Sequence, residues 1–134
     1  MHDGELARRA RQGDIDAYER LLRCYQDDAN LAAYFVLRQR EEAEDAVQEA
    51  FVRAWDRLDQ FDTDRAFRPW LLKIVVNEAR DRRRWRDRFE RLKLRAAEDP
   101  GARRSHRSPE GEVASRERMQ AVLDEIEQMD ETDR

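Results

Sequence analysis

Cysteine and histidine are scarce in this sequence of 134 residues, which has one cysteine and two histidines. The lone Cys24 excludes an internal disulfide and fits a reducing compartment. His2 and His106 are far apart and have no cysteine or histidine at ligand spacing, so we predict no metal site and no cofactor. An apolar signal segment and membrane-length apolar runs are also missing. We therefore predict a cytoplasmic protein with no membrane insertion.

Motifs that support catalysis are missing as well. Carboxylates are abundant, but none stands out beside a histidine or in a glycine-rich loop, and there is no phosphate-binding loop or nucleophile elbow. We predict that the protein is not an enzyme. Charged residues make up 43% of the sequence, and the mean hydropathy is −1.09. The core must therefore be small and built from thin apolar stripes.

The stretch from residue 41 to residue 70 organises the chain. Its first part places apolar residues at alternating steps of three and one, which indicates an uninterrupted amphipathic helix over residues 41–58. These apolar positions are Ala43, Ala46, Val47, Ala50, Phe51, Ala54, Trp55 and Leu58. The opposite face is acidic: residues 41–62 contain eight carboxylates and two arginines, a net charge of −6. After a loop over residues 59–66, a further helix begins at Phe67, with Pro69 suited to its first turn.

Two helical patterns precede this stretch. The first covers residues 5–12 and ends at Gly13, because glycine commonly follows a helix end. Asp14 can cap the second helix, with Ala17 at its third position. The apolar spacing drifts at residues 27–30, where we expect a bend or a widened apolar face.

No pattern of strands is present, so we predict an all-α fold. Residues 1–97 form a compact bundle of about four helices in this interpretation. Residues 98–112 contain two prolines, two glycines and no large apolar residue, which predicts a flexible linker. Residues 113–134 form an acidic tail with apolar residues at helical spacing, which could be one short helix.

Charges of opposite sign are separated along the chain. Although the net charge is −4, residues 80–95 contain nine basic and three acidic side chains, a net charge of +6. This block and the acidic helix face suggest two different partners, one anionic and one basic. The alternative is that both charge runs are merely solvated.

The first candidate site lies at the start of the basic block and includes Asn77 just before it. Polar residues recur there at steps of three, one, three and four, so that one helix face can lie along a phosphate backbone while Asn and Arg reach base edges. These residues are Asn77, Arg80, Asp81, Arg84 and Arg88. Near the start of that helix, Phe61, Phe67 and Trp70 could receive an unstacked base. Core packing is the favoured alternative for Phe67 and Trp70, which lie on the apolar stripe, whereas both roles are open for Phe61.

The acidic helix face contains the second candidate site. Asp45, Gln48 and Glu49 form a polar patch at positions i, i+3 and i+4, which can accept hydrogen bonds from Arg or Lys of a partner helix. Taken alone, such a patch is more often a solvated face.

Several of these segments together resemble region 2 of the extracytoplasmic-function sigma factors, small group-four relatives of the bacterial housekeeping sigma factor. They are residues 43–55 (AEDAVQEAFVRAW), 61–62 (FD) and 67–84 (FRPWLLKIVVNEARDRRR). Residues 11–25 are similar to the start of the same region. The match covers about the first 95 residues, and the combined spacing is specific although each piece alone is weak.

The resemblance implies packed helices and three roles. In the family, the helix with the DxxQE pattern docks on the clamp helices of the RNA polymerase beta-prime subunit, which implies this role for Asp45, Gln48 and Glu49. The following loop captures a flipped base of the promoter minus-ten element, here at residues 61–66. The resemblance implies contacts from Phe61, Asp62, Thr63 and Arg65. The next helix reads and melts the element, which implies roles for Trp70, Asn77, Arg80, Arg84 and, further along it, Arg88.

Family members carry a second domain, region 4, which is a helix-turn-helix that reads the minus-thirty-five element. We expect region 4 to be absent here, because the residues after Glu112 leave no room for it. The implied function is a transcription initiation factor domain that binds core RNA polymerase and the non-template strand of the minus-ten element. One alternative is an interaction module, bound by an anti-sigma factor or competing for the clamp without autonomous promoter recognition. The other is a basic helix that binds nucleic acids without sequence preference.

Overall fold

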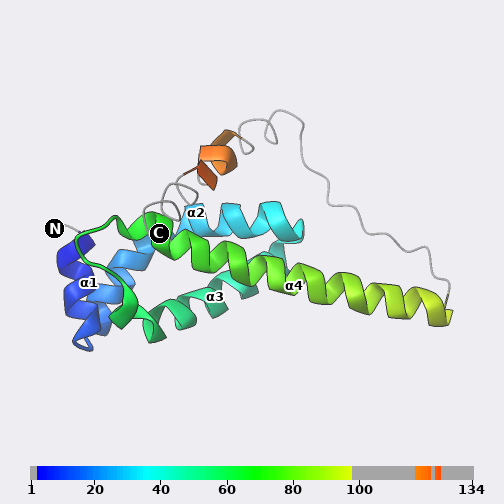
Figure 1. Cartoon of the computed structure of the whole chain (residues 1–134), viewed down its shortest axis with the longest axis horizontal. Coiled ribbons are helices and arrows are strands. Elements are labelled where there is room, and N and C mark those ends of the chain that lie inside the picture. Colours follow the sequence, from blue (N-terminus) through cyan, green and yellow to red (C-terminus); the bar gives the residue numbers. More distant parts are fainter. Residues whose placement is uncertain (1–2, 98–116, 122, 125–134) are drawn as a thin grey trace.

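The computed structural model describes residues 3–97, 117–121 and 123–124, and every regular element within these ranges is a helix (Figure 1). The elements in chain order are α1 (Asp3–Arg11), α2 (Ile15–Leu37), α3 (Arg40–Asp56), the short 3-10 helix η1 (Leu58–Gln60) and α4 (Phe67–Ala97). The predicted all-α fold is confirmed. Within these ranges no helix combines the length and the apolar character that crossing a membrane requires.

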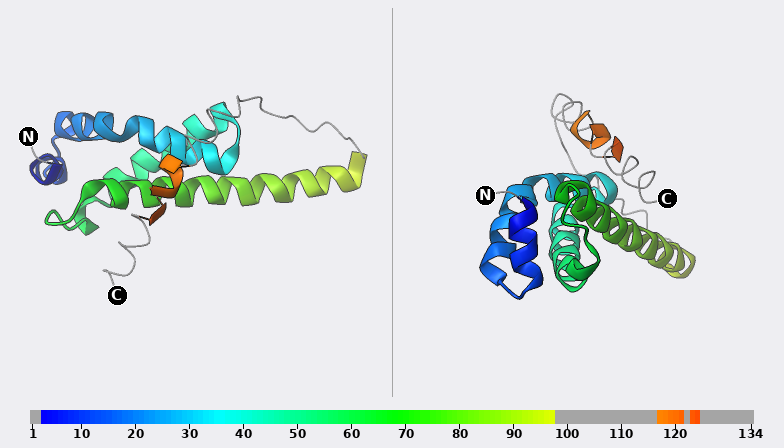
Figure 2. Two further views of the ribbon diagram at one scale, coloured as in Figure 1. Left: turned by 90° about the horizontal axis from the view of Figure 1, so that it is seen from above. Right: turned by 60° about the vertical axis from the view of Figure 1, so that its left-hand side comes forward.

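Helices α2, α3 and α4 pack against one another, and α1 packs on α2 at one end of the bundle (Figures 1 and 2). Large side chains fill the centre, among them the fully buried Leu21, Leu37, Phe67 and Leu71. Between them lie lines of buried alanines, which allow the helix backbones to approach closely. The outer half of α4 projects beyond the other described helices, and none of these covers its side chains.

Local chemistry explains the start and end of α2. Gly13 adopts a φ of 97°, which suits glycine, and the Asp14 carboxylate accepts a hydrogen bond from the Ala17 amide at 3.1 Å, as the sequence predicted. The helix ends at Leu37, and the next residue, Arg38, has the left-handed φ of 60° and donates its amide to the Tyr34 carbonyl. The helix is unbroken through residues 27–30, where the drifting pattern widens the buried face.

Both ends of two predicted helices differ from the structure. The first helix begins two residues earlier than expected and ends at Arg11 instead of residue 12. Helix α3 begins one residue earlier than predicted and ends at Asp56, two residues before the predicted end at Leu58. Leu58 belongs to η1, yet it is 2% exposed. The tighter 3-10 turn therefore keeps Leu58 in the core while it turns the chain towards α4.

Residues 117–121 and 123–124 are helical and lie on the α2 side of the bundle, away from α3 (Figures 1 and 2). Met119 is 7% exposed and belongs to the core, and Leu123 packs against it. The acidic tail thus contributes apolar side chains to the bundle, which its isolated pattern did not indicate. The linker predicted at residues 98–112 lies outside the described residues.

Candidate nucleic-acid interface

The acidic patch lies on the outer face of α3. Asp45, Gln48 and Glu49 are exposed together, because the residues between them, Ala46 and Val47, turn inward and are fully buried. Three side chains with acceptor oxygens therefore occupy neighbouring positions on one helix turn. Such a surface can accept several hydrogen bonds from Arg or Lys side chains of a partner.

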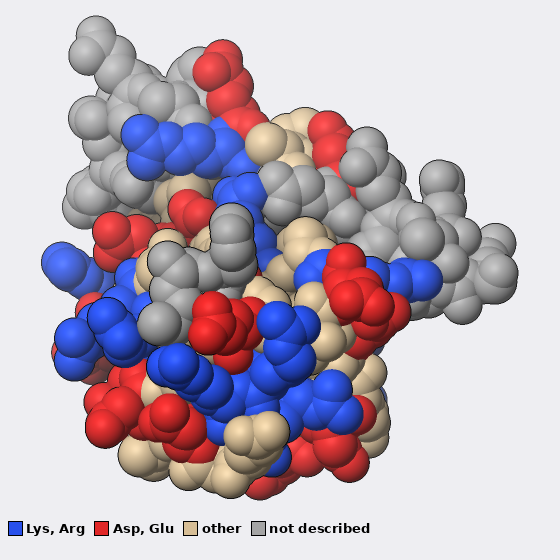
Figure 3. Space-filling view, turned by 90° about the vertical axis from the view of Figure 1, so that its left-hand side faces the viewer, with Lys and Arg blue, Asp and Glu red and all other residues tan. Residues whose placement is uncertain are grey.

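The loop after α3 is held by α1. The Arg11 guanidinium donates to the backbone carbonyls of Asp59 at 3.4 Å and Phe61 at 3.5 Å. A Cβ atom at Gly4 would lie 2.9 Å from the Thr63 carbonyl oxygen, so glycine permits this close approach of α1. Viewed from the α1 end, Lys and Arg side chains form a band flanked by Asp and Glu side chains (Figure 3).

Phe61 differs from the other loop residues because it is buried, with 3% exposure. Its ring meets Phe67 edge-on at a centroid distance of 5.3 Å and Trp70 at 5.1 Å. Phe61 therefore packs in the core here, as the almost fully buried Phe67 does, and Trp70 is half-buried.

The remaining predicted loop contacts lie nearer the surface. Asp62 and Arg65 are exposed and paired at 3.6 Å, and Thr63 is half-buried. These side chains can meet a ligand without any change in the core.

Beneath the loop, burial raises the pKa of Tyr25 above its ordinary value, and the hydrogen bond that Tyr25 donates to the Asp3 carboxylate acts in the same direction. The Tyr25 ring also lies 6.0 Å from that of Phe67. Under the loop, Tyr25 thus joins α2 to α1 through Asp3 and to the start of α4 through Phe67.

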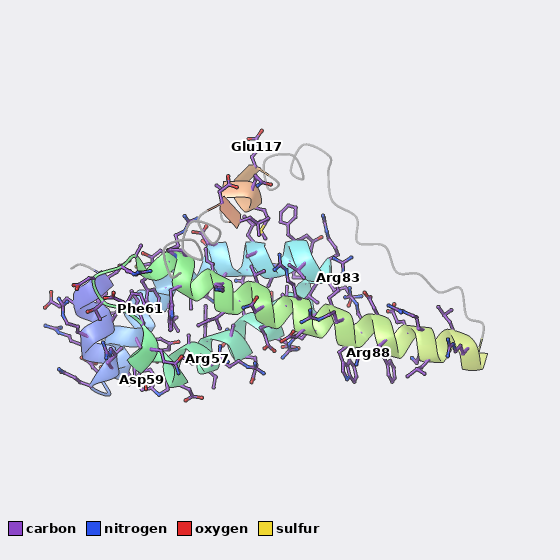
Figure 4. The ribbon with its side chains drawn as sticks, viewed as in Figure 1. Arg57, Asp59, Phe61, Arg83, Arg88 and Glu117 are labelled. Carbon is purple, nitrogen blue, oxygen red and sulfur yellow. The ribbon has the colours of Figure 1, made fainter. Side chains whose placement is uncertain are left out.

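The polar face of α4 agrees with the predicted spacing. Asn77, Arg80, Arg84 and Arg88 are all exposed, and Arg84 pairs with Asp81. Arg88 lies on the projecting part of α4, beyond the other helices (Figure 4). The helix therefore presents a row of donors that runs from the bundle out along its free end.

A polar pocket of about 350 Å³ lies between α3 and α4. Its walls bring together four of the predicted α4 residues with two further arginines, Arg53 of α3 and Arg57 directly after α3, for which the sequence analysis predicted no role. The lining residues are Arg53, Arg57, Ile74, Asn77, Glu78, Arg80, Asp81 and Arg84. Four arginines face two carboxylates here, so the pocket favours an anion such as a phosphate group.

The sequence does contain a signal for Arg53 and Arg57. Arg53 and Arg57 are the only basic residues in the acidic stretch 41–62, and their spacing of four places them on one face of the helix predicted over residues 41–58. Figure 4 labels Arg57 at the end of α3, close to the loop. What the sequence could not give was the packing angle that turns this side of α3 towards α4.

The projecting half of α4 also carries exposed apolar side chains. Trp85 and Phe89 stack with centroids 5.4 Å apart and planes 6° apart, and Leu92 continues the same stripe. Trp85 is 67% exposed. Lys93 places its ammonium group 5.4 Å from the centre of the Phe89 ring.

The part of the chain that matches known proteins includes the candidate residues of the acidic patch, the loop and the polar face of α4. Residues 16–89 match the family model of sigma-70 region 2. RNA polymerase sigma factor NccH of Alcaligenes xylosoxydans xylosoxydans is 35% identical over 96% of this chain and 69% of its own length. The ECF RNA polymerase sigma-E factor of Escherichia coli (strain K12) is 33% identical over 98% of this chain and 71% of its own length. ECF RNA polymerase sigma factor SigW of Bacillus subtilis is 39% identical over 56% of this chain and 40% of its own length.

Two solved structures are similar in fold and sequence. An engineered region 2 of sigmaE in complex with GTAAAA has a TM-score of 0.57 and 30% identity, and the match covers 72% of this chain and 95% of that one. CnrH in complex with the cytosolic domain of CnrY has a TM-score of 0.57 and 29% identity, and the match covers 98% of this chain and 99% of that one.

Proposed function

Because this chain belongs to the sigma-70 region 2 family and is related to extracytoplasmic-function sigma factors over most of its length, we propose that it binds core RNA polymerase and recognises and melts the minus-ten element. Sigma factors are transcription initiation factors and not enzymes. We divide the chain accordingly into a region 2 domain (residues 1–97), a linker (98–112) and an acidic tail (113–134).

The pocket between α3 and α4 is the observation that carries this proposal. It joins Asn77, whose amide can donate to and accept from a base edge, to four arginines that can pair with phosphates. An exposed row of arginines continues from the pocket along α4, so a strand of several nucleotides could follow it. In the proposal this strand is the non-template strand of the minus-ten element, by analogy with the relative bound to GTAAAA.

The loop takes the flipped base in this proposal. Asp62, Thr63 and Arg65 supply the polar contacts, and the half-buried Trp70 offers part of a ring. Phe61 supports the loop from the core side, and it can contact a base only if its ring leaves the aromatic cluster.

Polymerase docking is assigned to a different surface. We propose that Asp45, Gln48 and Glu49 bind the clamp helices of the beta-prime subunit. Their common exposure on α3 and the net negative charge of that stretch support a basic partner. The acidic patch adjoins the pocket between α3 and α4, because Glu49 Oε1 lies 3.7 Å from Nε of the pocket residue Arg53.

The DNA part is tested by fluorescence anisotropy with a labelled single strand containing GTAAAA, a panel of scrambled hexamers and the matching duplexes. We expect the wild type to prefer one single-stranded sequence. Asn77→Ala should weaken binding to that strand by about 1–3 kcal/mol, the value of one good base contact. Gln26→Ala, which removes an exposed amide from α2, is the matched control and should bind as the wild type does.

Equal binding of all sequences, with steep salt dependence, would instead identify a general basic helix. Failure of the wild type to bind any strand would refute the DNA part of the proposal.

A second candidate function is that of an anti-sigma target. The similarity to CnrH, solved with the cytosolic domain of CnrY, extends over 98% of this chain. The exposed Trp85, Phe89 and Leu92 also offer an uncovered apolar stripe of the kind that protein partners bury. This candidate predicts tight protein binding without any sequence preference for DNA.

A further inference from the structure

Glu78 is a buried carboxylate in the wall of the pocket between α3 and α4. It is 6% exposed, whereas the other carboxylate of the pocket, Asp81, is exposed. Removing a carboxylate from water is costly, and even a paired buried charge is weak evidence for stability. Stability alone therefore does not explain why a carboxylate is buried at this position.

The two oxygens of Glu78 face arginines from two helices. Oε1 accepts a hydrogen bond from Arg82 Nε at 3.1 Å, one turn along α4. Oε2 lies 3.3 Å from Arg53 Nε of α3, close enough for an ion pair, although it accepts no hydrogen bond among the described residues. Both contacts use Nε and so leave the outer Nη nitrogens of each guanidinium for other partners. Arg53 itself lines the pocket.

Two carboxylates, those of Glu78 and Glu49, compete for the Arg53 guanidinium. Its Nε also lies 3.7 Å from Glu49 Oε1, on the exposed surface of α3. Glu49 is 47% exposed and the Glu78 side chain 7%, so water screens the pair with Glu49 far more. Glu78 is therefore the stronger determinant of where the Arg53 guanidinium lies.

We propose that Glu78 is a positioning residue for DNA binding: it holds Arg53 at the pocket so that the outer nitrogens of Arg53 meet a phosphate of the bound strand. The inference rests on the proposed DNA function, because that strand is the one that follows Asn77, Arg80 and Arg84. Arg53 adds a contact from α3 to those from α4. At the pocket the strand is then bound between two helices, before it continues along α4.

Glu78→Gln distinguishes this role by the sign of its effect. The substitution keeps the size of the side chain and removes a negative charge from a pocket that binds a polyanion. If Glu78 only contributed charge, DNA would bind more tightly to the variant. The positioning role predicts the opposite, a loss of roughly three- to tenfold, because Arg53 no longer holds its place.

The assay uses the full 134-residue chain and the labelled GTAAAA strand at several salt concentrations. Arg53→Met should weaken binding about as much as Glu78→Gln and lower the slope of log K against log salt by about 0.7, the value of one phosphate contact on a single strand. In the Arg53→Met background, Glu78→Gln should cause no further loss. Glu90→Gln, which neutralises an exposed carboxylate of the same helix, should bind as tightly as the wild type or more tightly.

The inference is overturned if Glu78→Gln binds as well as the wild type or better, or if the losses in the double variant add. Circular dichroism and thermal unfolding check that each variant is folded. Should Glu78→Gln not fold, an unchanged salt slope in Arg53→Met overturns the inference on its own. The positioning role alone is refuted if the wild type binds one sequence preferentially, Asn77→Ala weakens that binding and Glu78→Gln does not. Absence of wild-type binding refutes the DNA function as well.

Discussion

Arg86 of α4 joins three helices at one point, and its replacement gives the sharpest prediction about stability. Its Nη1 donates to the Leu37 carbonyl at 2.9 Å and to Glu42 Oε2 at 2.6 Å. Leu37 is the last residue of α2, where carbonyl groups lack partners within the helix. Glu42 lies in the first turn of α3. The Arg86 side chain is 20% exposed, so water replaces these bonds poorly.

The two contacts set the expected loss in Arg86→Met. A hydrogen bond between a charged donor and a carbonyl contributes about 1.5–3 kcal/mol. The pair with Glu42 adds less than about 1 kcal/mol, because the Glu42 side chain is 38% exposed and therefore partly screened. We expect the free energy of unfolding to fall by about 2–3 kcal/mol, and the melting temperature by roughly 4–8 °C per kcal/mol.

Urea denaturation followed by circular dichroism measures this loss. Arg83→Met is the matched control, because Arg83 is an exposed arginine of the same helix whose contact with Asp87 is 4.0 Å long. The control should lose less than about 0.5 kcal/mol. A double-mutant cycle with Glu42→Gln then isolates the ion pair. A loss in Arg86→Met no larger than in Arg83→Met would refute the reasoning.

Three further predictions concern other parts of the bundle. Tyr18 donates a hydrogen bond to the Phe51 carbonyl, and burial raises its pKa above the ordinary value of 10.0. The contribution of Tyr18 to the free energy of unfolding is therefore complete below pH 10 and is lost as the pH rises further. Tyr18→Phe should cost about 1 kcal/mol at neutral pH, and the melting temperature of this variant should fall less steeply at alkaline pH than that of the wild type. Arg38→Gly should be about 1 kcal/mol more stable than Arg38→Ala in urea denaturation. Both variants lose the contact of the guanidinium with the Phe35 ring, but only glycine adopts the φ of 60° without steric strain. Met119→Ala should lower the free energy of unfolding by about 2 kcal/mol, and an unchanged urea midpoint would show that the tail does not stabilise the bundle.

Features set by neighbouring residues could be predicted from the sequence. Asp14 caps α2, as its position after Gly13 indicated, and Phe67 opens α4 beside Pro69. The stripe on α3 is buried because a spacing of three and four places side chains on one helix face in any helical fold. The all-α fold and the exposed position of the acidic patch follow from the same periodicity.

Features set by contacts between distant residues could not be predicted. Arg53 and Glu78 are 25 positions apart, and only the packing of α3 on α4 makes them neighbours. The burial of Phe61 depends on rings from the next helix, and the hold of Arg11 on the loop spans 50 residues. Arg38 adopts a left-handed conformation that glycine usually supplies, so local preference did not reveal where α2 ends.

Binding to the clamp helices of the RNA polymerase beta-prime subunit tests the central claim most directly. The measurement compares the wild type with the triple variant Asp45→Ala/Gln48→Ala/Glu49→Ala at moderate salt. The matched control Glu19→Ala/Gln26→Ala/Asp27→Ala removes two carboxylates and one amide from the exposed surface of α2.

With helicity unchanged, we expect the wild type and the control to bind equally and the α3 variant to bind at least about tenfold more weakly. Binding by the α3 variant that equals that of the wild type, or no binding by the wild type, would contradict the polymerase-docking role.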